Sequence, residues 1–398
     1  MLALEYFWLR LGIINAGPSI RFAHDFAPAR QWLSKLIIAL AYSQNSTSSG
    51  TALLLLSLLK KLDKLRDRIG SPKRLNTQDM DFTLKIYRKL LETLQAQGYQ
   101  FLTFEQYCML GLRPQDESLN RVTAESPSDK QQETSDTREA SIASPTHRIT
   151  ESPERSDIAS DSPNHRITAS PTKYIILRHD VDLKAENSVE TAKIEHSLGI
   201  KASYYFRVVP DSDKPDCIRA IADMGHEIGY HYEDMSLCGG NPEKAVAHFA
   251  EKLAYFRTYY PVKTICMHGA PTSQYDSKDI WQFASYKNDF DLIGEPYFDV
   301  DFSDLFYLTD TGRRWDGYKV SVRDKIPTYQ DVWTANGWVY KRTDDIIRAC
   351  DNSSLPNRIM ITTHPQRWTD SKAKGMQEAI VQNLKNTVKY LLIKWRSK

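Results

Sequence analysis

Apolar and polar positions follow two different periodicities over the C-terminal half of the chain. Short apolar runs have the length of strands, and the segments between them repeat apolar residues at helical spacing. The predicted strands are 174–182, 202–208, 226–232, 262–267, 291–294, 305–309 and 358–363. The predicted helices are 185–198, 215–224, one that begins at Asn241 and Pro242, and a last one with Met376, Ile380, Leu384, Val388 and Leu391 on one face. Alternation of this kind predicts an α/β fold with a parallel sheet, and about seven units predict a closed or nearly closed barrel.

A separate stretch, residues 79–112, carries the same kind of pattern. Phe82, Ile86, Leu90 and Leu94 recur at helical spacing, and Gly98 is placed to end that helix before a short strand at 99–103. We therefore predict that this stretch is the first part of the barrel domain, which resumes at residue 173 and continues to residue 398.

The remaining segments do not share that pattern. Residues 1–78 predict a helical N-terminal extension, with helices at 32–42 and 51–69 and a polar connector between them. This extension carries no candidate chemistry, and a membrane-surface or partner-binding role is the alternative to a purely accessory one.

Residues 113–172 are rich in Ser, Thr, Pro and charged side chains. They contain a repeated segment, Ser144–Pro153 and again Ser162–Pro171. A stretch so poor in large apolar residues cannot bury a core, and we predict a disordered low-complexity insertion. His147 and His165 lie in the repeat, where nothing is predicted to hold a metal ion in place.

Composition narrows the functional classes. The chain has 398 residues, 41% hydrophobic and 26% charged, as soluble globular proteins do. Its net charge of +2 gives no indication of nucleic-acid binding. Five scattered cysteines without a CxxC pair indicate reduced thiols. The longest apolar runs are well short of the roughly 20 residues of a membrane span, and no basic leader opens the chain, so we expect a cytoplasmic protein.

Ionisable residues gather where four predicted strands end. Five of the ten histidines, His179, His226, His231, His268 and His364, lie in or directly after these strands. The C-terminal ends of parallel strands in a barrel meet at one mouth, so these distant residues are predicted to face one pocket.

The first of these strands supplies carboxylates. Side chains alternate between the two faces of a strand, so Arg178, Asp180 and Asp182 share one face and His179 takes the other. The two carboxylates then lie about 6–7 Å apart. That spacing suits one carboxylate on a metal ion and one beside it as a base. The alternative is that Asp182 only caps the helix that follows.

The histidines supply the other ligands. His226 and His231 point to opposite faces, and we favour His231 as the ligand because it is nearer the strand end and Gly229 leaves space beside it. His226 is then a buried histidine bonded to backbone, or a further ligand. His268 stands before a tight turn at 269–271, and His364 has the chemistry of a general acid. Asp and His ligands with an open position define a catalytic divalent-metal site, for which Zn²⁺ fits best.

Substrate contacts are predicted from aromatic and charged residues close to the strand ends. Asp310, Arg313 and Trp315 follow one strand, and Trp368 follows the last; with Arg178 they have the chemistry to stack on and bond a sugar-like substrate. Glu295 is a weaker candidate of the same type. The alternative for the 307–315 segment is a surface loop with a packed tryptophan.

These motifs resemble the NodB-homology polysaccharide deacetylases of carbohydrate esterase family 4, in a divergent branch with an Arg-His-Asp-Val-Asp box. The resemblance covers roughly 79–112 and 173–370 and implies a distorted (β/α)₇ TIM-like barrel. The family's first motif, which supplies a base Asp and a metal Asp, falls on Asp180 and Asp182 in an order left open. His364 matches the histidine that serves as the acid.

Two family motifs are altered in this chain. The motif His-Ser/Thr-x-x-His matches at His231, but Met235 stands at its second histidine. His226, His179 or His268 would then supply the third ligand, or the metal is bound differently or not at all. The Arg-Pro motif is replaced by residues 267–271.

The resemblance implies a metal-dependent hydrolase that deacetylates an N-acetylated sugar or a related acyl amide. Asp180 would be the base, Asp182, His231 and a further histidine the ligands, and His364 the acid. A small molecule or an oligosaccharide is the expected substrate, and the oligomeric state stays open. The alternative is a non-hydrolytic or metal-free barrel that acts as a sugar-binding or regulatory module.

Overall fold

The structure is a computed structural model that describes residues 81–112, 171–270, 273–319, 321, 324–379, 382 and 386. The predicted N-terminal extension and the predicted insertion lie outside the described residues, except for 171 and 172 at the end of the insertion. Most of the predicted C-terminal helix lies outside them as well, although residues 372–379 are helical. Across the described part of the chain, none of the helices combines the length and the apolar character that crossing a membrane requires.

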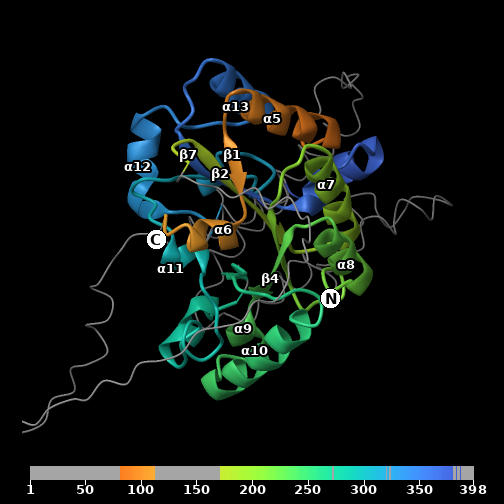
Figure 1. The fold of residues 1–398 in the computed structure, drawn as a ribbon, viewed down its shortest axis with the longest axis vertical. Coiled ribbons are helices and arrows are strands. Elements are labelled where there is room, and N and C mark those ends of the chain that lie inside the picture. Colours follow the sequence, from red (N-terminus) through yellow and green to blue (C-terminus); the bar gives the residue numbers. More distant parts are fainter. Residues whose placement is uncertain are drawn as a thin grey trace, which may run out of the picture. The chain divides into compact units, whose positions relative to one another are not determined.

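One parallel sheet forms the centre of the described structure (Figure 1). Its strands are β1 (Gln100–Leu102), β2 (Tyr174–Val181), β3 (Ser203–Phe206), β4 (Glu227–Tyr232), β5 (Ile265–Met267), β6 (Phe306–Thr309) and β7 (Arg358–Thr363). The order across the sheet is β5-β4-β3-β2-β7-β6, and every pairing is parallel. The predicted α/β class with a parallel sheet is confirmed.

The sheet has the form of a partial TIM-like barrel. β5 and β6 are the ends of its path, and no strand of the described residues joins them. The strand predicted at 291–294 is reduced to one bridge, between Gly294 and Thr264, beside β5. Gly294 has no room for a side chain, because a Cβ there would lie 2.5 Å from the sulfur of Cys108. The seven-fold closed barrel therefore stays a prediction.

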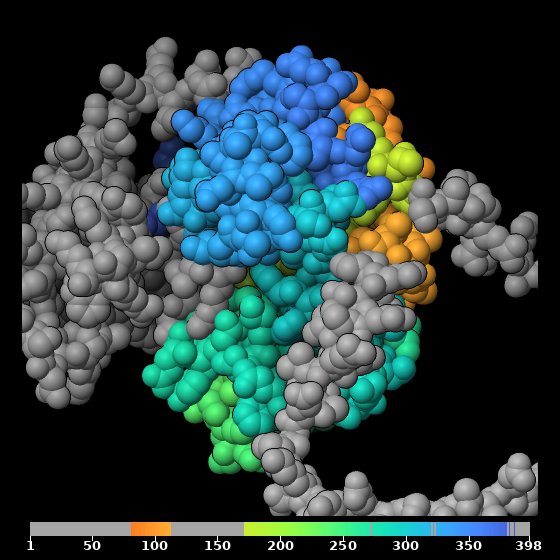
Figure 2. Space-filling view, turned by 90° about the vertical axis from the view of Figure 1, so that its left-hand side faces the viewer, coloured from red at the N-terminus to blue at the C-terminus, as the bar shows by residue number. Residues whose placement is uncertain are grey.

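Helices cover the sheet. They are α5 (Leu84–Ala96), α6 (Phe104–Met109), α7 (Ala185–Ser197), α8 (Pro215–Asp223), α9 (Asp234–Leu237), α10 (Pro242–Phe256), α11 (Pro296–Asp299), α12 (Pro327–Ala335) and α13 (Thr343–Asp351), with 3₁₀ turns η3 (Ser277–Gln282), η4 (Gly317–Lys319) and η5 (Pro365–Arg367). The face in Figure 2 is formed mainly by the segments after β4, with orange residues of the 81–112 stretch at its right-hand edge. Because helices lie on the sheet, all eight residues of β2 are buried, as in parallel sheets generally.

Local sequence signals explain several helix ends. The side chain of Asn241 accepts a hydrogen bond from the backbone N–H of Lys244, and Pro242 opens α10, as predicted. Thr103 and Gln106 form a capping box at α6. Gly98 follows α5 with a φ of +81°, a conformation that glycine adopts without strain.

Residues 81–112 pair with and hydrogen-bond to the sheet at the N-terminal ends of the strands. β1 pairs with the first half of β2, on the edge that β3 occupies further along. The first N–H groups of α6 then donate to the sheet. Phe104 N bonds Ser203 Oγ at 2.7 Å, and Glu105 N bonds the Glu227 carboxylate at 3.0 Å. α6 thus satisfies its unpaired N–H groups on side chains that begin β3 and β4.

Candidate metal centre and active site

One positional pattern organises the site. The first residue after each of six neighbouring strands is ionisable. Across the sheet these residues are His268 after β5, Glu233 after β4, Arg207 after β3, Asp182 after β2, His364 after β7 and Asp310 after β6. Because the strands are parallel, all six residues lie at the same end of the sheet.

These strand-end residues contact one another in sequence across the sheet. His268 Nδ1 lies 2.8 Å from Glu233 Oε2, and Arg207 Nε donates to Glu233 Oε1 at 2.8 Å. Arg207 Nη1 then reaches the backbone oxygen of Asp182 at 3.4 Å. On the other side of Asp182, His364 Nε2 lies 3.8 Å from its Oδ2. The row therefore links the ends of five strands without a gap, and Asp310 extends it.

Asp182 stands at the centre of this row. Its Oδ1 lies 3.6 Å from His231 Nε2 and 3.5 Å from His268 Nε2. This oxygen is buried and accepts no hydrogen bond from any described residue. Its Oδ2, in contrast, accepts a hydrogen bond from Gln366 Nε2 at 3.3 Å. Burial opposes ionisation of Asp182, but His231, His268 and His364 outweigh it and hold its pKa well below the usual range.

The two histidines are oriented by their other ring nitrogens. His231 Nδ1 lies 2.9 Å from the backbone oxygen of Cys266, and His268 Nδ1 lies against Glu233. A carbonyl oxygen only accepts, so Nδ1 of His231 carries the proton and its Nε2 is free to act as a ligand. Burial lowers the pKa of His268, which favours the neutral ring that metal binding requires. One carboxylate oxygen without a hydrogen bond and two imidazole nitrogens are donor types that Zn²⁺ takes. Their three atoms do not all lie within 4.8 Å of one another; among the described residues, those of Asp180, His231 and Cys266 do.

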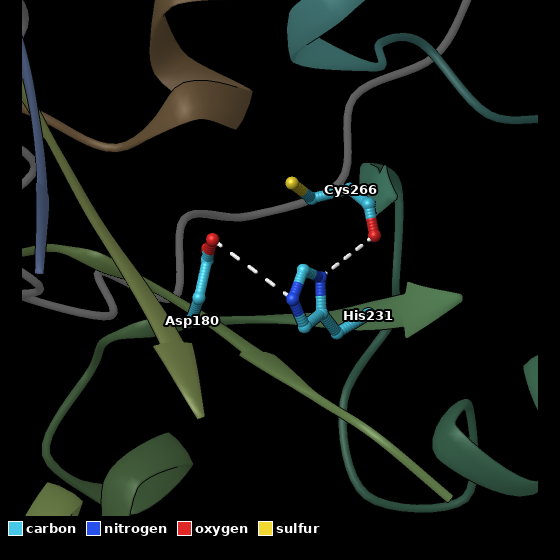
Figure 3. A group of neighbouring side chains, drawn as sticks. All are labelled: Asp180, His231 and Cys266. Carbon is cyan, nitrogen blue, oxygen red and sulfur yellow. Dashed lines mark hydrogen bonds and ion pairs between the residues drawn. The ribbon is translucent and has the colours of Figure 1, made fainter. Parts of the chain in front are cut away.

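Asp180 lies beside these ligands on the same face of β2. Arg178 donates to both of its oxygens, at 2.9 and 2.8 Å. Its Oδ2 lies 3.9 Å from His231 Nε2, the contact drawn in Figure 3. Burial opposes ionisation of Asp180, but the charge of Arg178 outweighs it and lowers its pKa. Asp180 is therefore a fixed, ionised carboxylate next to the candidate metal site.

Cys266 is a third neighbour of His231, and the sequence did not single it out. Ligand atoms of Asp180, His231 and Cys266 all lie within 4.8 Å of one another (Figure 3). Burial raises the pKa of the Cys266 thiol well above its usual value, and Arg178 donates to both oxygens of Asp180. The group around Asp182 differs from this one in its buried oxygen, which accepts no hydrogen bond from any described residue.

His364 is held on the opposite side of Asp182. Its Nδ1 lies 2.6 Å from Asp310 Oδ1, and its backbone N–H donates to Asp310 Oδ2 at 3.0 Å. Asp310 also accepts from Arg367 and from Trp368 Nε1. Burial and the charge of Arg367 lower the pKa of His364, but Asp310 and Asp182 outweigh them and raise it. The raised pKa favours the protonated ring of His364, whose Nε2 faces Asp182.

Two histidines of the predicted set lie elsewhere. His226 precedes β4 and bonds α7, with Nε2 3.2 Å from the backbone oxygen of Ala192, while Nδ1 accepts from Ala202 N. His179 points to the same side, where its Nε2 lies 2.8 Å from Glu195 Oε1. Both rings are fully buried between the sheet and α7. The structure thus does not bring His226 to the metal site, because it faces the helix layer and not the strand ends.

The predicted substrate contacts have partners inside the protein instead. Trp315 is 3% exposed and its Nε1 donates to Thr343. Arg313 donates to the backbone oxygens of Arg367 and Asp81. Trp368 and Arg178 are each 1% exposed, and Asp310 is occupied by His364. Asp310 and Arg178 orient His364 and Asp180. A substrate-binding role for these five residues stays a prediction.

The fold shows the surroundings of two further residues from the sequence analysis, Met235 and Glu295. Met235 lies in α9 and is 5% exposed, packed into the core, so it supplies no ligand. Glu295 caps α11 and accepts the backbone N–H of Met267, which makes it a structural residue.

Searches of protein-family models and of curated proteins give no match to this chain. Among solved structures, matches include a CE4-family pseudoenzyme from Bacillus anthracis and a mutant of it with restored enzymatic activity. Both are 12% identical to this chain, with a TM-score of 0.29 and 54% of this chain covered. The chain spans 62% of the wild-type chain and 64% of the mutant chain, less than two thirds of either. The family resemblance therefore rests on the sequence motifs.

Proposed function

We propose that the chain is a metal-dependent hydrolase that removes an acyl group from an amide, with N-acetylated sugars as the substrate class. One observation carries the proposal. Oδ1 of Asp182, which accepts no hydrogen bond from any described residue, faces Nε2 of both His231 and His268. Two further ionisable groups lie beside this site: the carboxylate of Asp180 and the imidazole of His364.

Asp182, His231 and His268 would hold the ion. Each of these side chains is held by a contact at its other polar atom: Asp182 Oδ2 by Gln366, and Nδ1 of His231 and of His268 by the Cys266 carbonyl and Glu233. Such outer contacts are usual around metal ligands, because they fix the tautomer and the direction of each ring. A divalent ion bound there would polarise the acyl carbonyl and lower the pKa of water.

Asp180 is the general base in this proposal. A carboxylate has about four lone-pair sites, so it can accept a proton from water while Arg178 still donates to both oxygens. Arg178 keeps Asp180 ionised and fixes its direction. Asp182 is less suited to that role, because its free oxygen lies between two ligand nitrogens.

His364 is the general acid. Its Nε2 would donate the proton to the amine nitrogen as the bond to the acyl carbon breaks, and Asp310 would hold the ring throughout. The environments of the two histidines beside Asp182 push their pKa values apart, down for His268 and up for His364. Such a division of neighbouring groups is typical of acid–base sites.

The choice of an N-acetylated sugar is supported by the motif resemblance. A metal-free sugar-binding or regulatory barrel is the second candidate, and the observation that favours it is Met235, a buried side chain where the family motif has its second histidine.

The test combines zinc content with acetate release from a panel of N-acetylated sugars. We expect about one zinc ion per chain and turnover of at least one substrate. Asp180→Asn and His364→Ala should each lower kcat by about 10²–10⁴-fold while zinc content stays unchanged and circular dichroism shows both variants folded. Glu190→Gln, which alters an exposed ion pair with Lys193, is the control.

The outcomes separate the two candidates. Protein that binds no zinc and releases no acetate supports the metal-free barrel. Zinc binding without acetate release rejects the substrate class, and full turnover in either variant rejects the assigned acid or base.

A further inference from the structure

We propose that Glu233, anchored by Arg207, is the positioning residue that makes His268 the third metal ligand, in place of a side chain at position 235. This inference rests on the metal site of the proposed function. It concerns two residues that neither the sequence motifs nor the resemblance singled out.

The carboxylate of Glu233 divides its two oxygens between two partners. Oε2 lies 2.8 Å from His268 Nδ1, and Oε1 accepts from Arg207 Nε at 2.8 Å and Nη2 at 2.5 Å. Glu233 is 5% exposed, so these charged hydrogen bonds are shielded from water.

Arg207 ties this pair to the rest of the site. Its Nη1 donates to the backbone oxygen of Asp182 at 3.4 Å, while Nε and Nη2 hold Glu233. The guanidinium group is planar and rigid, so it sets the position of Glu233 relative to the backbone of Asp182. The contacts then close a ring: Asp182, Arg207, Glu233, His268 and back to Asp182 Oδ1.

His268 needs such an anchor more than His231 does. His231 lies within β4 and is 2% exposed, whereas His268 comes after β5 and its side chain is 15% exposed. The next residue is Gly269, which restricts the backbone least. The two imidazole rings nonetheless meet at an interplanar angle of 74°, with both Nε2 atoms directed to the same oxygen of Asp182. Glu233 makes the side-chain contact that fixes the His268 ring in that direction.

The departure from the family motif is explained by this ring. Met235 belongs to α9, which turns its side chain into the core directly after Glu233. The side chain at the position of the missing histidine is therefore a buried methionine, which supplies neither an imidazole nor a carboxylate. A histidine from the neighbouring strand can replace it only if its ring is held against β4, and Glu233, the residue after β4, holds it there.

The experiment measures zinc affinity by competition with a chromophoric chelator. The proteins compared are the wild type, Glu233→Ala, Glu233→Gln, His268→Ala and the double variant Glu233→Ala/His268→Ala. We expect Glu233→Ala to weaken zinc binding by about 10–100-fold, as the loss of an outer-shell carboxylate does. Glu233→Gln keeps an acceptor for Nδ1 and should lose less. Glu190→Gln should bind as the wild type does.

The double variant separates positioning from a general structural role. If Glu233 acts through His268, Glu233→Ala should cause no further loss once His268 is replaced. An equal further loss in the His268→Ala background would overturn the proposal, and so would wild-type affinity in Glu233→Ala.

Failure of the proposed function has a different signature. A wild-type protein that binds no zinc rejects the metal site itself. A wild type that binds zinc with unchanged affinity in both Glu233 variants rejects the positioning role alone. Circular dichroism of the metal-free proteins identifies a variant that fails to fold, and Glu233→Gln, which preserves the shape of the side chain, then decides the outcome.

Discussion

Asp182 and Cys266 both lie close to His231, but they differ in what they offer an ion. Asp182 has a buried oxygen without a hydrogen bond from any described residue, whereas Cys266 has a thiol whose pKa burial raises. We therefore expect Asp182→Asn to abolish stoichiometric zinc binding and Cys266→Ala to leave it unchanged. Zinc content of the purified variants, measured by mass spectrometry, checks both. Zinc loss in Cys266→Ala with retention in Asp182→Asn would move the site to the Asp180, His231 and Cys266 group.

At the level of single residues, the sequence predicted those that end strands and carry obvious chemistry. Asp182, His231 and His268 were named as ligands, and the structure brings them together. Alternation also predicted that only one of His226 and His231 could face the site. Arg207 and Glu233 were missed because their role depends on a contact between residues of neighbouring strands. A signal did exist: each directly follows a predicted or observed strand end.

Three residues predicted to contact substrate have partners inside the protein. Trp315, Trp368 and Arg313 were assigned to substrate because they follow strands and combine aromatic and cationic chemistry. The structure packs Trp315 against Trp368 and places Arg313 over Phe82. Whether such side chains turn outward or into the core depends on the loops that carry them, and sequence patterning does not determine that.

At the level of elements, β4 depends on one glycine. A Cβ on Gly229 would lie 2.3 Å from the ring of Tyr205 and 2.9 Å from the backbone oxygen of Thr264. Tyr205 is fully buried and its hydroxyl is bonded to Thr264 Oγ1, so its ring cannot move aside freely. We expect Gly229→Ala to lower the free energy of unfolding by about 1–3 kcal/mol, through overpacking between β3, β4 and β5.

Urea unfolding followed by tryptophan fluorescence measures this change. Zinc affinity should fall as well, because His231 lies two residues further along β4 and faces the same side. An unchanged free energy of unfolding in Gly229→Ala would contradict this prediction, because it would mean that Tyr205 can move to make room for a Cβ at residue 229.

Strands and long helices were predicted closely, and short elements were not. β2, β6 and β7 match the predicted runs to within a residue or two, because a continuous apolar run in a parallel sheet leaves a clear signal. α12 and α13 were not predicted. Each has nine residues, as α8 does, and α13 carries Ile346, Ile347, Ala349 and Cys350 on its buried face, a helical pattern that sequence analysis passed over. The short strand at 291–294 was overestimated because Gly294 makes only a bridge.

For the molecule as a whole, the strand-end row is a property of topology. The strands that carry His364 and Asp310 are late in the chain, yet β7 lies beside β2 at the centre of the sheet. Asp182 is thereby flanked by residues from both sides. Opposite charges are neighbours along the row, with Arg207 between Glu233 and Asp182. This arrangement offsets part of the desolvation free energy of burying several ionisable groups together.

The opposite end of the sheet carries a buried carboxyl group that affects overall stability. Glu227 begins β4 and accepts from Ser203 Oγ, Thr264 Oγ1 and the backbone N–H of Glu105. Burial outweighs these hydrogen bonds and raises its pKa from 4.5 to about 7. No cation takes part in these contacts, and the carboxyl group is 1% exposed.

The raised pKa makes stability fall as pH increases. Between pH 4.5 and about 7 the unfolded chain releases this proton while the folded chain keeps it, so the unfolded state is favoured progressively. A shift of this size corresponds to roughly 3 kcal/mol once both states are ionised. Glu227→Gln removes the titration and approximates the protonated side chain. We therefore expect its free energy of unfolding, relative to the wild type, to be higher at pH 8 than at pH 5 by about 2–3 kcal/mol.

Urea unfolding of both proteins at the two pH values measures this difference, and the difference between proteins cancels the titration of all other groups. Glu190→Gln, at an exposed position, controls for the change in net charge. Ser203 and Thr264 have hydroxyl groups that can donate or accept, so they can bond the amide that replaces the carboxyl group. The same stability difference at both pH values would mean that Glu227 is ionised in the folded protein from pH 5 upward, with its three donors sufficient to compensate for burial.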